Sequence, residues 1–331
     1  MSQHFLLSAQ ARTLSVRQIA KLSEQEAHDL LKTIRWGHRD EDMVCPHCGT
    51  VHAPYRIKTR NQYRCKHCQH TFSVTSGTIF ANHKLPISVY LLAIVLFVNA
   101  VKGISALQLA RDLGVQYKTA FVLAHKIRES LMEQRHNDTL TGEVHVDGAY
   151  VNHYIRPKNK KSERIDRRLA VNQRDDKRCV LVMRQGTEKT KTFVLKSENQ
   201  ASVMVLAQAH IDSNAFICAD ESNAYDPLHG KFKIGRVNHS QEYRSADGIT
   251  NNYAESFFSR FRRMQLGQCH KFSNRYLDNY ANEAAYREDM RQAANGEQFD
   301  DVAHKCVKTK ASRDWCGYWQ GNKRDGERLA A

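Results

Sequence analysis

The chain has 331 residues, 41% of them hydrophobic, and its formal net charge at pH 7 is +15. This length exceeds one small domain and predicts two or three, and the apolar fraction excludes a wholly disordered chain. The basic balance favours a polyanionic partner, with nucleic acid ahead of an anionic membrane surface. On charge alone, a basic protein without such a partner stays an alternative.

The N-terminal residues and the cysteines bear on the cellular compartment. Residues 1–12 lack a basic start followed by a long apolar run, so they predict no signal peptide. The longest apolar stretch, Val89 to Val101, contains Asn99 and is too short to span a bilayer, which predicts a buried helix. Nine cysteines without a secretory signal indicate reduced thiols and metal ligation rather than disulfides. We therefore expect a cytoplasmic protein without a membrane partner.

The first predicted element is a helix between Leu14 and Trp36, within an N-terminal helical segment that spans residues 1–43. Apolar residues recur there at helical spacing. Ser23 and Glu26 have the spacing of a capping box, which predicts a helix N-terminus near residue 23.

Residues 44–84 contain two CxxC pairs and predict a zinc ribbon. The four cysteines are Cys45, Cys48, Cys65 and Cys68. Each pair offers two thiolates to one tetrahedral Zn²⁺, and the residues between the pairs are enough for two strands that bring them together. Gly49 allows a tight turn after the first pair. Free thiols or a redox pair are the alternatives. The nearby histidines are expected to be exposed rather than ligands: His47, His52, His67 and His70.

Basic residues are interleaved with tyrosines along the same ribbon. The basic residues are Arg56, Lys58, Arg60, Arg64 and Lys66, and the tyrosines are Tyr55 and Tyr63. Such a pattern predicts contacts with nucleic-acid phosphates together with stacking on the aromatic rings. A solvated basic face is the alternative.

Residues 85–141 predict a helical region that contains a helix-turn-helix. Pro86 opens a helix over residues 88–101, the next helix ends at Gly114, and a polar turn leads into a third helix over residues 116–129. Candidates in the third helix for contacts with a DNA groove are Lys118, Lys126 and Arg128. A plain helical hairpin that joins two domains is the alternative.

Residues 142–295 predict an α/β domain with a mixed sheet covered by helices, and residues 296–331 a polar tail. Strands are expected at Val144–Val151, Cys179–Arg184, Thr192–Leu195, Phe216–Asp220 and Ile234–Asn238. Helices are expected at Ala201–Ile211, from Asn252 onward, and at Asn274–Gln292. Strands followed by alternating helices and strands are typical of such a domain. The tail residues Trp315, Tyr318 and Trp319 dock either on the body of the protein or on another subunit.

Three acids in separate elements are the most informative feature of the chain. Asp147 follows the alternating residues of one strand, Asp220 ends a buried strand, and Glu255 lies at the start of a helix. Only the fold can bring them together, and convergent carboxylates suit hard divalent cations such as Mg²⁺. They predict a metal-dependent catalytic site, although each acid taken alone is equally typical of a surface or capping role.

The helix that begins at Asn252 has two distinct stripes. Its apolar stripe predicts a core-facing side and consists of Ala254, Phe257, Phe258 and Phe261. Glu255 and Arg262 share an adjacent stripe, where Arg262 is expected to bind a phosphate group. An ordinary exposed pair is the alternative for these two residues.

Two further segments are candidates for contacts with the substrate. Residues 156–178 are rich in Lys and Arg, including Lys160 and Lys161. They predict either a mobile basic loop that contacts the DNA backbone or a solvated loop. His239 follows a strand near the acids and is expected either to position water or phosphate or to be an ordinary loop residue.

These motifs resemble those of the DDE transposases, and in detail those of the IS1595-type, or ISXO2-like, transposases. The resemblance rests on HVDG at residues 145–148, on Ala219 and Asp220, on VNHS at residues 237–240, on NYAESFF at residues 252–258, and on Arg262. It implies a ribonuclease H-like catalytic domain in which Asp147, Asp220 and Glu255 hold Mg²⁺ or Mn²⁺ for two-metal-ion phosphoryl transfer. Some members carry Asn at the third position, so Asn252 competes with Glu255 for that role.

The same resemblance implies a DNA transposase of a bacterial insertion sequence, located in the cytoplasm and associated with the nucleoid. It implies metal-dependent cleavage of 3′ ends and strand transfer, with water and then a 3′-hydroxyl as nucleophile. The expected partners are double-stranded DNA, as terminal inverted repeats and target DNA, and further copies of the chain in a homo-oligomer. Two alternatives stay open: a non-catalytic DNA-binding regulator, and a metal-dependent nuclease without strand transfer.

Overall fold

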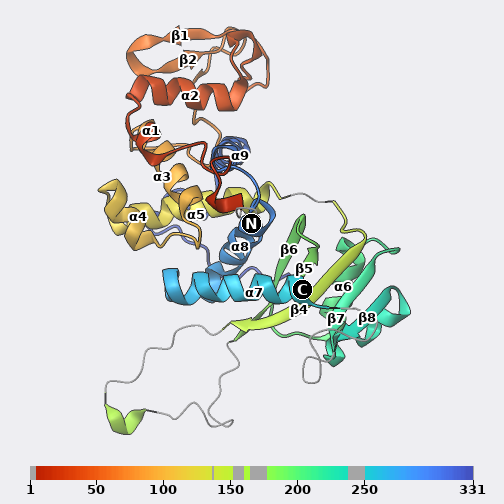
Figure 1. Ribbon diagram of the computed structural model, residues 1–331. Helices are drawn as coiled ribbons and strands as arrows, with labels where there is room; N and C mark the ends of the chain where they lie inside the picture. Colours follow the sequence, from red (N-terminus) through yellow and green to blue (C-terminus); the bar gives the residue numbers. More distant parts are fainter. Residues whose placement is uncertain (1–4, 136–137, 152–159, 165–176, 238–249, 331) are drawn as a thin grey trace. The chain divides into compact units, whose positions relative to one another are not determined.

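The computed structural model describes residues 5–135, 138–151, 160–164, 177–237 and 250–330. The chain divides into two compact units. The first, here called the helical unit, contains Met1–Arg135 and Met290–Arg324. The second, called the sheet unit, contains His136–Asp289 and Asp325–Ala331. Figure 1 labels most of the helices and strands of both units.

The helical unit begins with the helices α1 (Val16–Ala20) and α2 (Glu24–Trp36). The predicted capping box is confirmed: the Ser23 hydroxyl accepts a hydrogen bond from the Glu26 backbone at 3.3 Å, and the Glu26 carboxylate accepts one from the Ser23 backbone at 2.8 Å. The region from Leu14 to Trp36 is helical as predicted, and the predicted N-terminus near residue 23 is where α2 begins, because Ser23 adopts an extended backbone as the N-cap and separates α2 from α1.

A three-stranded antiparallel sheet forms the ribbon, in the order β1 (Tyr55–Ile57), β2 (Gln62–Arg64) and β3 (Thr71–Phe72). Its inner face packs on α2, where the Tyr63 ring centroid lies 6.1 Å from that of Trp36. The Tyr63 and Phe72 ring centroids are 5.7 Å apart. These rings give the ribbon a small apolar core beside its cysteines.

The predicted helical region contains α3 (Ile87–Asn99), α4 (Ala106–Leu113) and α5 (Tyr117–Glu133). Most residues of α3 are buried, as predicted for a core helix. Gly114 ends α4 at a φ of 64°, a left-handed conformation that favours glycine and allows the turn into α5. Within the described part of the chain, no helix has the length and apolarity needed to cross a membrane.

A further helix, α9 (Asn295–Lys308), lies where the sequence predicts only a polar tail. It packs on α3 and α5 and buries Phe299, Val302 and Cys306. The many charged residues on the outer side of α9 make the segment polar on average, so its average composition does not reveal the apolar stripe. Beyond α9, Trp315 is 2% exposed and stacks on His125 of α5 at 4.8 Å, so this ring docks on the helical unit.

The sheet unit is built on five strands: β4 (Glu143–Val151), β5 (Arg178–Gln185), β6 (Lys189–Leu195), β7 (Phe216–Asp220) and β8 (Lys233–Val237). Their order across the sheet is β6-β5-β4-β7-β8. The strands β4, β5 and β6 pair antiparallel, whereas β7 runs parallel to β4, and β8 parallel to β7. This confirms the predicted mixed sheet, and each strand overlaps the segment where the sequence places it.

Helices cover both faces of this sheet. The helix α6 (Gln200–His210) and the short helix η6 (Asn223–Gly230) bury one face in an apolar core that includes Val144, Val146 and Ile217. The opposite face is covered by α7 (Asn252–Met264) and α8 (Leu277–Asp289). Side chains alternate along β4, so the odd-numbered residues between Val144 and Gly148 point to this second face.

Arg184 ties both of these helices to the sheet. This residue of β5 is 2% exposed and donates to the carbonyl oxygen of Tyr253, in α7, at 3.0 Å. Its guanidinium also pairs with Glu288, in α8, at 3.0 Å. Through these contacts Arg184 joins β5 to the first turn of α7, where Glu255 lies.

Candidate functional site

Two of the predicted acids lie side by side on neighbouring strands. In the parallel pair of β4 and β7, Val146 is opposite Ala219. Asp147 and Asp220 are the next residues on the two strands, and both are half-buried. Because neighbouring strands are about 4.8 Å apart, this register brings the two carboxylates together at the end of β7.

The third predicted acid comes from α7, which is anchored in two ways. Its apolar stripe is buried, as predicted: Ala254, Phe257, Phe258 and Phe261. Just before the helix, the fully buried Asn251 donates through Nδ2 to the carbonyl oxygen of Val146 at 3.3 Å. This bond joins the start of α7 to β4 directly before Asp147, and it leaves Glu255 half-buried on the following turn.

The pKa of Asp147 shows that several acids share one electrostatic environment. The pKa of this carboxyl is raised to about 7, first by burial and then by the charge of Asp220. The charges of Glu198 and Glu255 contribute to this rise, whereas a hydrogen bond from the Gly148 backbone, 2.8 Å long, opposes it. Three other carboxylates therefore lie close enough to Asp147 to repel its charge.

Glu198 is the fourth acid of this site and was not predicted. It lies between β6 and α6, directly before Asn199, the N-cap of α6. Burial raises the pKa of its carboxyl, a hydrogen bond from the Tyr225 hydroxyl lowers it, and Asp220 raises it. In a sequence, an acid beside a helix N-cap is typical of local capping, so nothing there marks Glu198 for chemistry.

The donor set of the acid site fits hard divalent cations. All four side chains are carboxylates, and Mg²⁺ and Mn²⁺ take oxygen ligands. Among the described acids, no three bring one carboxylate oxygen each within 4.8 Å of one another. The acids therefore lie near one another, but no three of the described carboxylates meet at one point.

The other two predicted residues of α7 are exposed. Asn252 opens the helix, and Arg262 lies near its C-terminal end. Glu255, in the first turn of the same helix, differs from Asn252: it is half-buried, and its charge raises the pKa of Asp147.

A buried histidine lies on the same face of the sheet as Asp147. His145 is fully buried, and its Nε2 is 2.7 Å from the Glu143 carboxylate. Burial lowers the pKa of this imidazole, and Glu143 opposes that effect. Cys218 is opposite His145 on β7, and the three side chains bring their ligand atoms within 4.8 Å.

The four cysteines of the ribbon form a closed ligand set, as predicted. Their sulfur atoms all lie within 4.8 Å of one another, and the Sγ–Sγ distances are 3.7 Å for Cys45 and Cys68 and 3.7 Å for Cys48 and Cys65. Sulfurs bound at about 2.3 Å around a tetrahedral Zn²⁺ lie about 3.8 Å apart, so the site fits zinc. The backbone of Cys68 donates to the Cys65 sulfur at 3.4 Å, which supports the thiolate.

The two knuckles turn in the same way. Gly49 has a φ of 75°, as expected from the tight turn, and Gln69 at the corresponding place in the second knuckle has a φ of 62°. His47 and His70 are exposed and stack on each other, with ring centroids 3.5 Å apart. Together with Cys68 their ligand atoms lie within 4.8 Å, but Cys68 already belongs to the four-cysteine set.

The predicted basic side chains of the ribbon are all exposed: Arg56, Lys58, Arg60, Arg64 and Lys66. Tyr55 is 58% exposed and lies opposite Arg64, with the Lys66 ammonium 5.2 Å from its ring centroid. Tyr63 is 4% exposed and packs on Trp36, so the prediction that it stacks on nucleic-acid bases is wrong. Side chains alternate along β2, which turns Tyr63 inward and Arg64 outward.

The three residues of α5 that were predicted to contact DNA differ in their exposure. Lys118, in its first turn, is exposed. Lys126 and Arg128 are only 9% and 1% exposed, and the Arg128 guanidinium donates to the carbonyl oxygen of Ile104 at 3.2 Å. The prediction that these two side chains reach a DNA groove is therefore wrong, because every residue from Leu123 to Leu131 is buried.

Only part of the predicted basic loop is described. Lys160 and Lys161 are exposed, at the short helix η4 (Lys161–Glu163). Residues 156–159 and 165–176 of that loop lie outside the described residues, as does His239.

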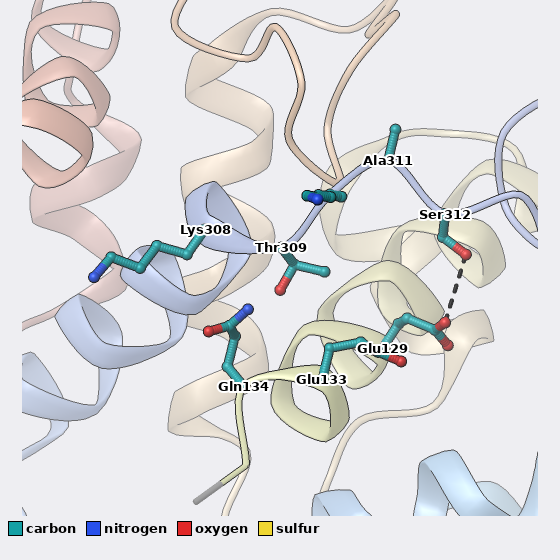
Figure 2. A pocket seen from close by; sticks show the side chains of 8 residues that line it. Glu129, Glu133, Gln134, Lys308, Thr309, Ala311 and Ser312 are labelled. Atoms are coloured by element: carbon teal, nitrogen blue, oxygen red, sulfur yellow. Dashed lines mark hydrogen bonds between the residues drawn. The ribbon is translucent and has the colours of Figure 1, made fainter. Parts of the chain in front are cut away.

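Figure 2 shows a pocket of about 330 Å³ in the helical unit. It is lined by the ends of α5 and α9 and by the residues that follow them: Glu129, Glu133, Gln134, Lys308, Thr309, Lys310, Ala311 and Ser312. The Ser312 hydroxyl donates to Glu129 at 3.5 Å, and Glu129 also pairs with the buried Arg324 at 3.1 Å. None of the predicted catalytic residues lines this pocket, so it is separate from the acid site.

Two protein families match the chain. The ISXO2-like transposase domain matches residues 139–289, and the transposase zinc-ribbon domain matches residues 22–71. The first match contains the four acids and the second the four cysteines. A protein described as an uncharacterized protein in transposable element ISH50, from Halobacterium salinarum, is 27% identical over 254 residues, or 73% of this chain and 83% of that relative. No solved structure matches the chain.

Proposed function

Since this chain belongs to the ISXO2-like transposases of the IS1595 family, we propose that it cleaves the 3′ ends of an insertion sequence and joins them to target DNA. The observation that carries the proposal is the convergence of Asp147, Asp220 and Glu255 inside the matched transposase domain. These acids come from β4, β7 and α7, so their meeting is a property of the fold rather than of local sequence.

In this proposal Asp147, Asp220 and Glu255 hold Mg²⁺ or Mn²⁺. Such ions, when bound, activate the attacking oxygen and stabilise charge on the leaving oxygen. The chain itself fixes the carboxylates: the register of β4 and β7 sets the two aspartates, and the bond from Asn251 to Val146 holds the start of α7. Because burial and the neighbouring carboxylates raise the pKa of Asp147 to about 7, a cation competes with a proton for this carboxylate.

We assign the third acidic position to Glu255 rather than to Asn252. Glu255 is half-buried and interacts with Asp147, whereas Asn252 is exposed at the start of the helix. Arg262 is on the exposed side of the same helix, where its guanidinium suits a DNA phosphate.

The sheet unit is proposed to have a ribonuclease H-like fold. Support comes from its five-stranded mixed sheet with helices on both faces. The acids lie on the first and fourth strands of this sheet in chain order and on a later helix.

Two surfaces of the helical unit are proposed to bind the terminal inverted repeats. The exposed ribbon face around Tyr55 and Arg64 combines an aromatic ring with positive charge, which suits phosphates and unstacked bases. The exposed first turn of α5 carries Lys118, and recognition helices contact DNA through their N-terminal residues. Lys160 and Lys161 add positive charge for the DNA backbone, and a homo-oligomer on the DNA would pair the two ends.

One assay separates this proposal from its alternatives. The purified protein is incubated with Mg²⁺, a labelled duplex that carries an end repeat, and a target plasmid. Joined products are expected for a transposase, cut ends without joining for a nuclease, and a shifted band without cutting for a regulator. A shifted band of the duplex without any cutting of the DNA, in Mg²⁺ as well as in Mn²⁺, would overturn the proposal.

A further inference from the structure

We propose that Glu198 is a fourth cation-binding carboxylate of the acid site, which the Tyr225 hydroxyl orients toward Asp147 and Asp220. The inference rests on the proposed function, because it concerns the same site. It goes beyond the three acids that define the transposase resemblance, and it assigns a role to a segment between β6 and α6.

The path of the chain brings Glu198 to the acids from across the sheet. The strand β6 is separated from β4 by β5, so the residues after β6 must cross β5 to reach β4. They do so: the backbone N–H of Glu198 donates to the Tyr150 hydroxyl, on β4, at 3.1 Å. Gly148 is on the same face as Val146, which α6 covers, so Glu198 approaches β4 from the α6 side of the sheet. Glu255 approaches from the α7 side.

The missing side chain of Gly148 leaves room for the carboxylate group of Glu198 itself, rather than for the methylene groups of that side chain. A β-carbon placed on Gly148 would lie 2.5 Å from Oε1, 2.6 Å from Cδ and 2.9 Å from Oε2 of Glu198. The whole carboxylate is thus seated on the backbone directly after Asp147. Any other residue at position 148 would displace it, which explains a glycine inside a strand.

Tyr225 fixes how this carboxylate is oriented. The tyrosine is fully buried in η6 and donates its hydroxyl hydrogen bond to Oε1 of Glu198. Burial and the charge of Glu198 hold the pKa of Tyr225 well above its usual range, so the phenol stays protonated and remains a donor. With Oε1 engaged in this way, Oε2 is the oxygen that a cation would take.

A purely structural role for Glu198 is the competing explanation. A buried acceptor for Tyr225 does not require a charge, since a glutamine amide oxygen would accept the same hydrogen bond. The charge is instead set beside Asp147 and Asp220, where it raises the pKa of Asp147 and is itself opposed by Asp220. A fourth negative charge in this place is unfavourable without a cation and favourable with one.

The test measures Mn²⁺ binding to the full chain, with zinc already in the ribbon, by the loss of the free Mn²⁺ signal in electron paramagnetic resonance. Glu198→Gln is expected to weaken binding by about tenfold or more, in the range of supporting changes at metal sites. Tyr225→Phe keeps the ring but removes the donor and is expected to weaken binding less. Glu221→Gln, at an exposed acid beside Asp220, is the matched control and should bind as wild type does.

The outcomes distinguish failure of the inference from failure of the proposed function. Wild-type affinity in Glu198→Gln, together with weakened binding in Asp147→Asn, would overturn the role of Glu198 alone. Wild-type affinity in Asp147→Asn as well would overturn the acid site as a cation site. Without Mn²⁺, Glu198→Gln should unfold at the wild-type temperature or above, because one of four repelling charges is gone. A lower unfolding temperature with unchanged Mn²⁺ affinity would show that Glu198 is structural.

Discussion

The zinc ribbon and the acid site each gather four anionic side chains, yet they are assembled in opposite ways. The ribbon draws its cysteines from two local knuckles, and each knuckle sets its own spacing. The acid site draws its carboxylates from β4, β7, α7 and the segment before α6. A site of the first kind depends on short turns, whereas one of the second kind depends on strand register and on helix packing.

The two sites also differ in how closely their ligands meet. The ribbon sulfurs lie 3.7 Å apart in pairs, near the separation that a bound Zn²⁺ imposes. No three of the described acids bring their carboxylate oxygens within 4.8 Å of one another, and burial together with the neighbouring carboxylates raises the pKa of Asp147 to about 7. We infer a permanent structural ion in the ribbon and exchangeable catalytic ions at the acids.

The largest expected effect concerns the third acid. Glu255→Gln removes a negative charge from the acid site. The transition state for cleavage then loses several kcal/mol of stabilisation, which lowers the cleavage rate by roughly a thousandfold. Asn252→Ala, at an exposed position three residues earlier, should lower the rate far less. Single-turnover cleavage of an end-repeat duplex measures both variants. The reverse order would give the third position to Asn252.

The ribbon is tested by removing one thiolate. Cys65→Ser opens the four-cysteine set, so the zinc content should fall from about one ion per chain to far less, and the ribbon should unfold. DNA end binding should weaken while the sheet unit stays folded. Elemental analysis and circular dichroism measure these effects, with Cys316→Ser as the control for a cysteine outside the set. An unchanged zinc content in Cys65→Ser would contradict the assignment.

The raised pKa of Asp147 predicts a pH effect on stability when no divalent cation is added. Between a pKa of 3.8 in the unfolded chain and about 7 in the folded chain, the folded state holds the proton more tightly. The free energy of unfolding therefore falls as pH rises through this window, by about 1 kcal/mol or more. Denaturant titrations should show a smaller fall in Asp147→Asn. Identical pH profiles for the two proteins would count against the raised pKa of Asp147.

The smallest expected effect concerns single charges on the ribbon. Arg64→Ala removes one exposed cation beside Tyr55 and should lower the slope of log affinity against log salt by about one unit. Arg39→Ala is the matched control, since Arg39 is exposed but pairs with Asp42 at 2.8 Å. Fluorescence anisotropy over a range of salt concentrations measures both slopes. Equal slopes for Arg64→Ala and the wild type would remove Arg64 from the DNA surface.

Much of the fold was predictable because its signals are local. The CxxC spacing predicts the ribbon, and the apolar stripe from Ala254 to Phe261 predicts the buried side of α7. The strand that ends at Asp220 has the observed bounds, since a short apolar run followed by an acid marks both its core and its end.

What the sequence did not predict depends on long-range packing. The charges of Lys126 and Arg128 suggest DNA contacts, but the packing around α5 buries both side chains. Tyr63 is similar, because strand pairing turns it onto α2. Glu198 reaches the acids only because the chain after β6 crosses β5, and no spacing pattern encodes that path.

We propose above all that Asp147 and Asp220, on separate strands, act as one cation site for DNA cleavage and joining. The most direct test compares single-turnover cleavage by Asp147→Asn, Asp220→Asn and the double variant, with DNA binding measured in parallel. Residues that act as a unit are strongly non-additive, so each single variant should lose roughly a thousandfold in rate and the double variant no more. Binding should stay near the wild-type level. Full activity in Asp220→Asn, or losses that multiply in the double variant, would contradict the claim.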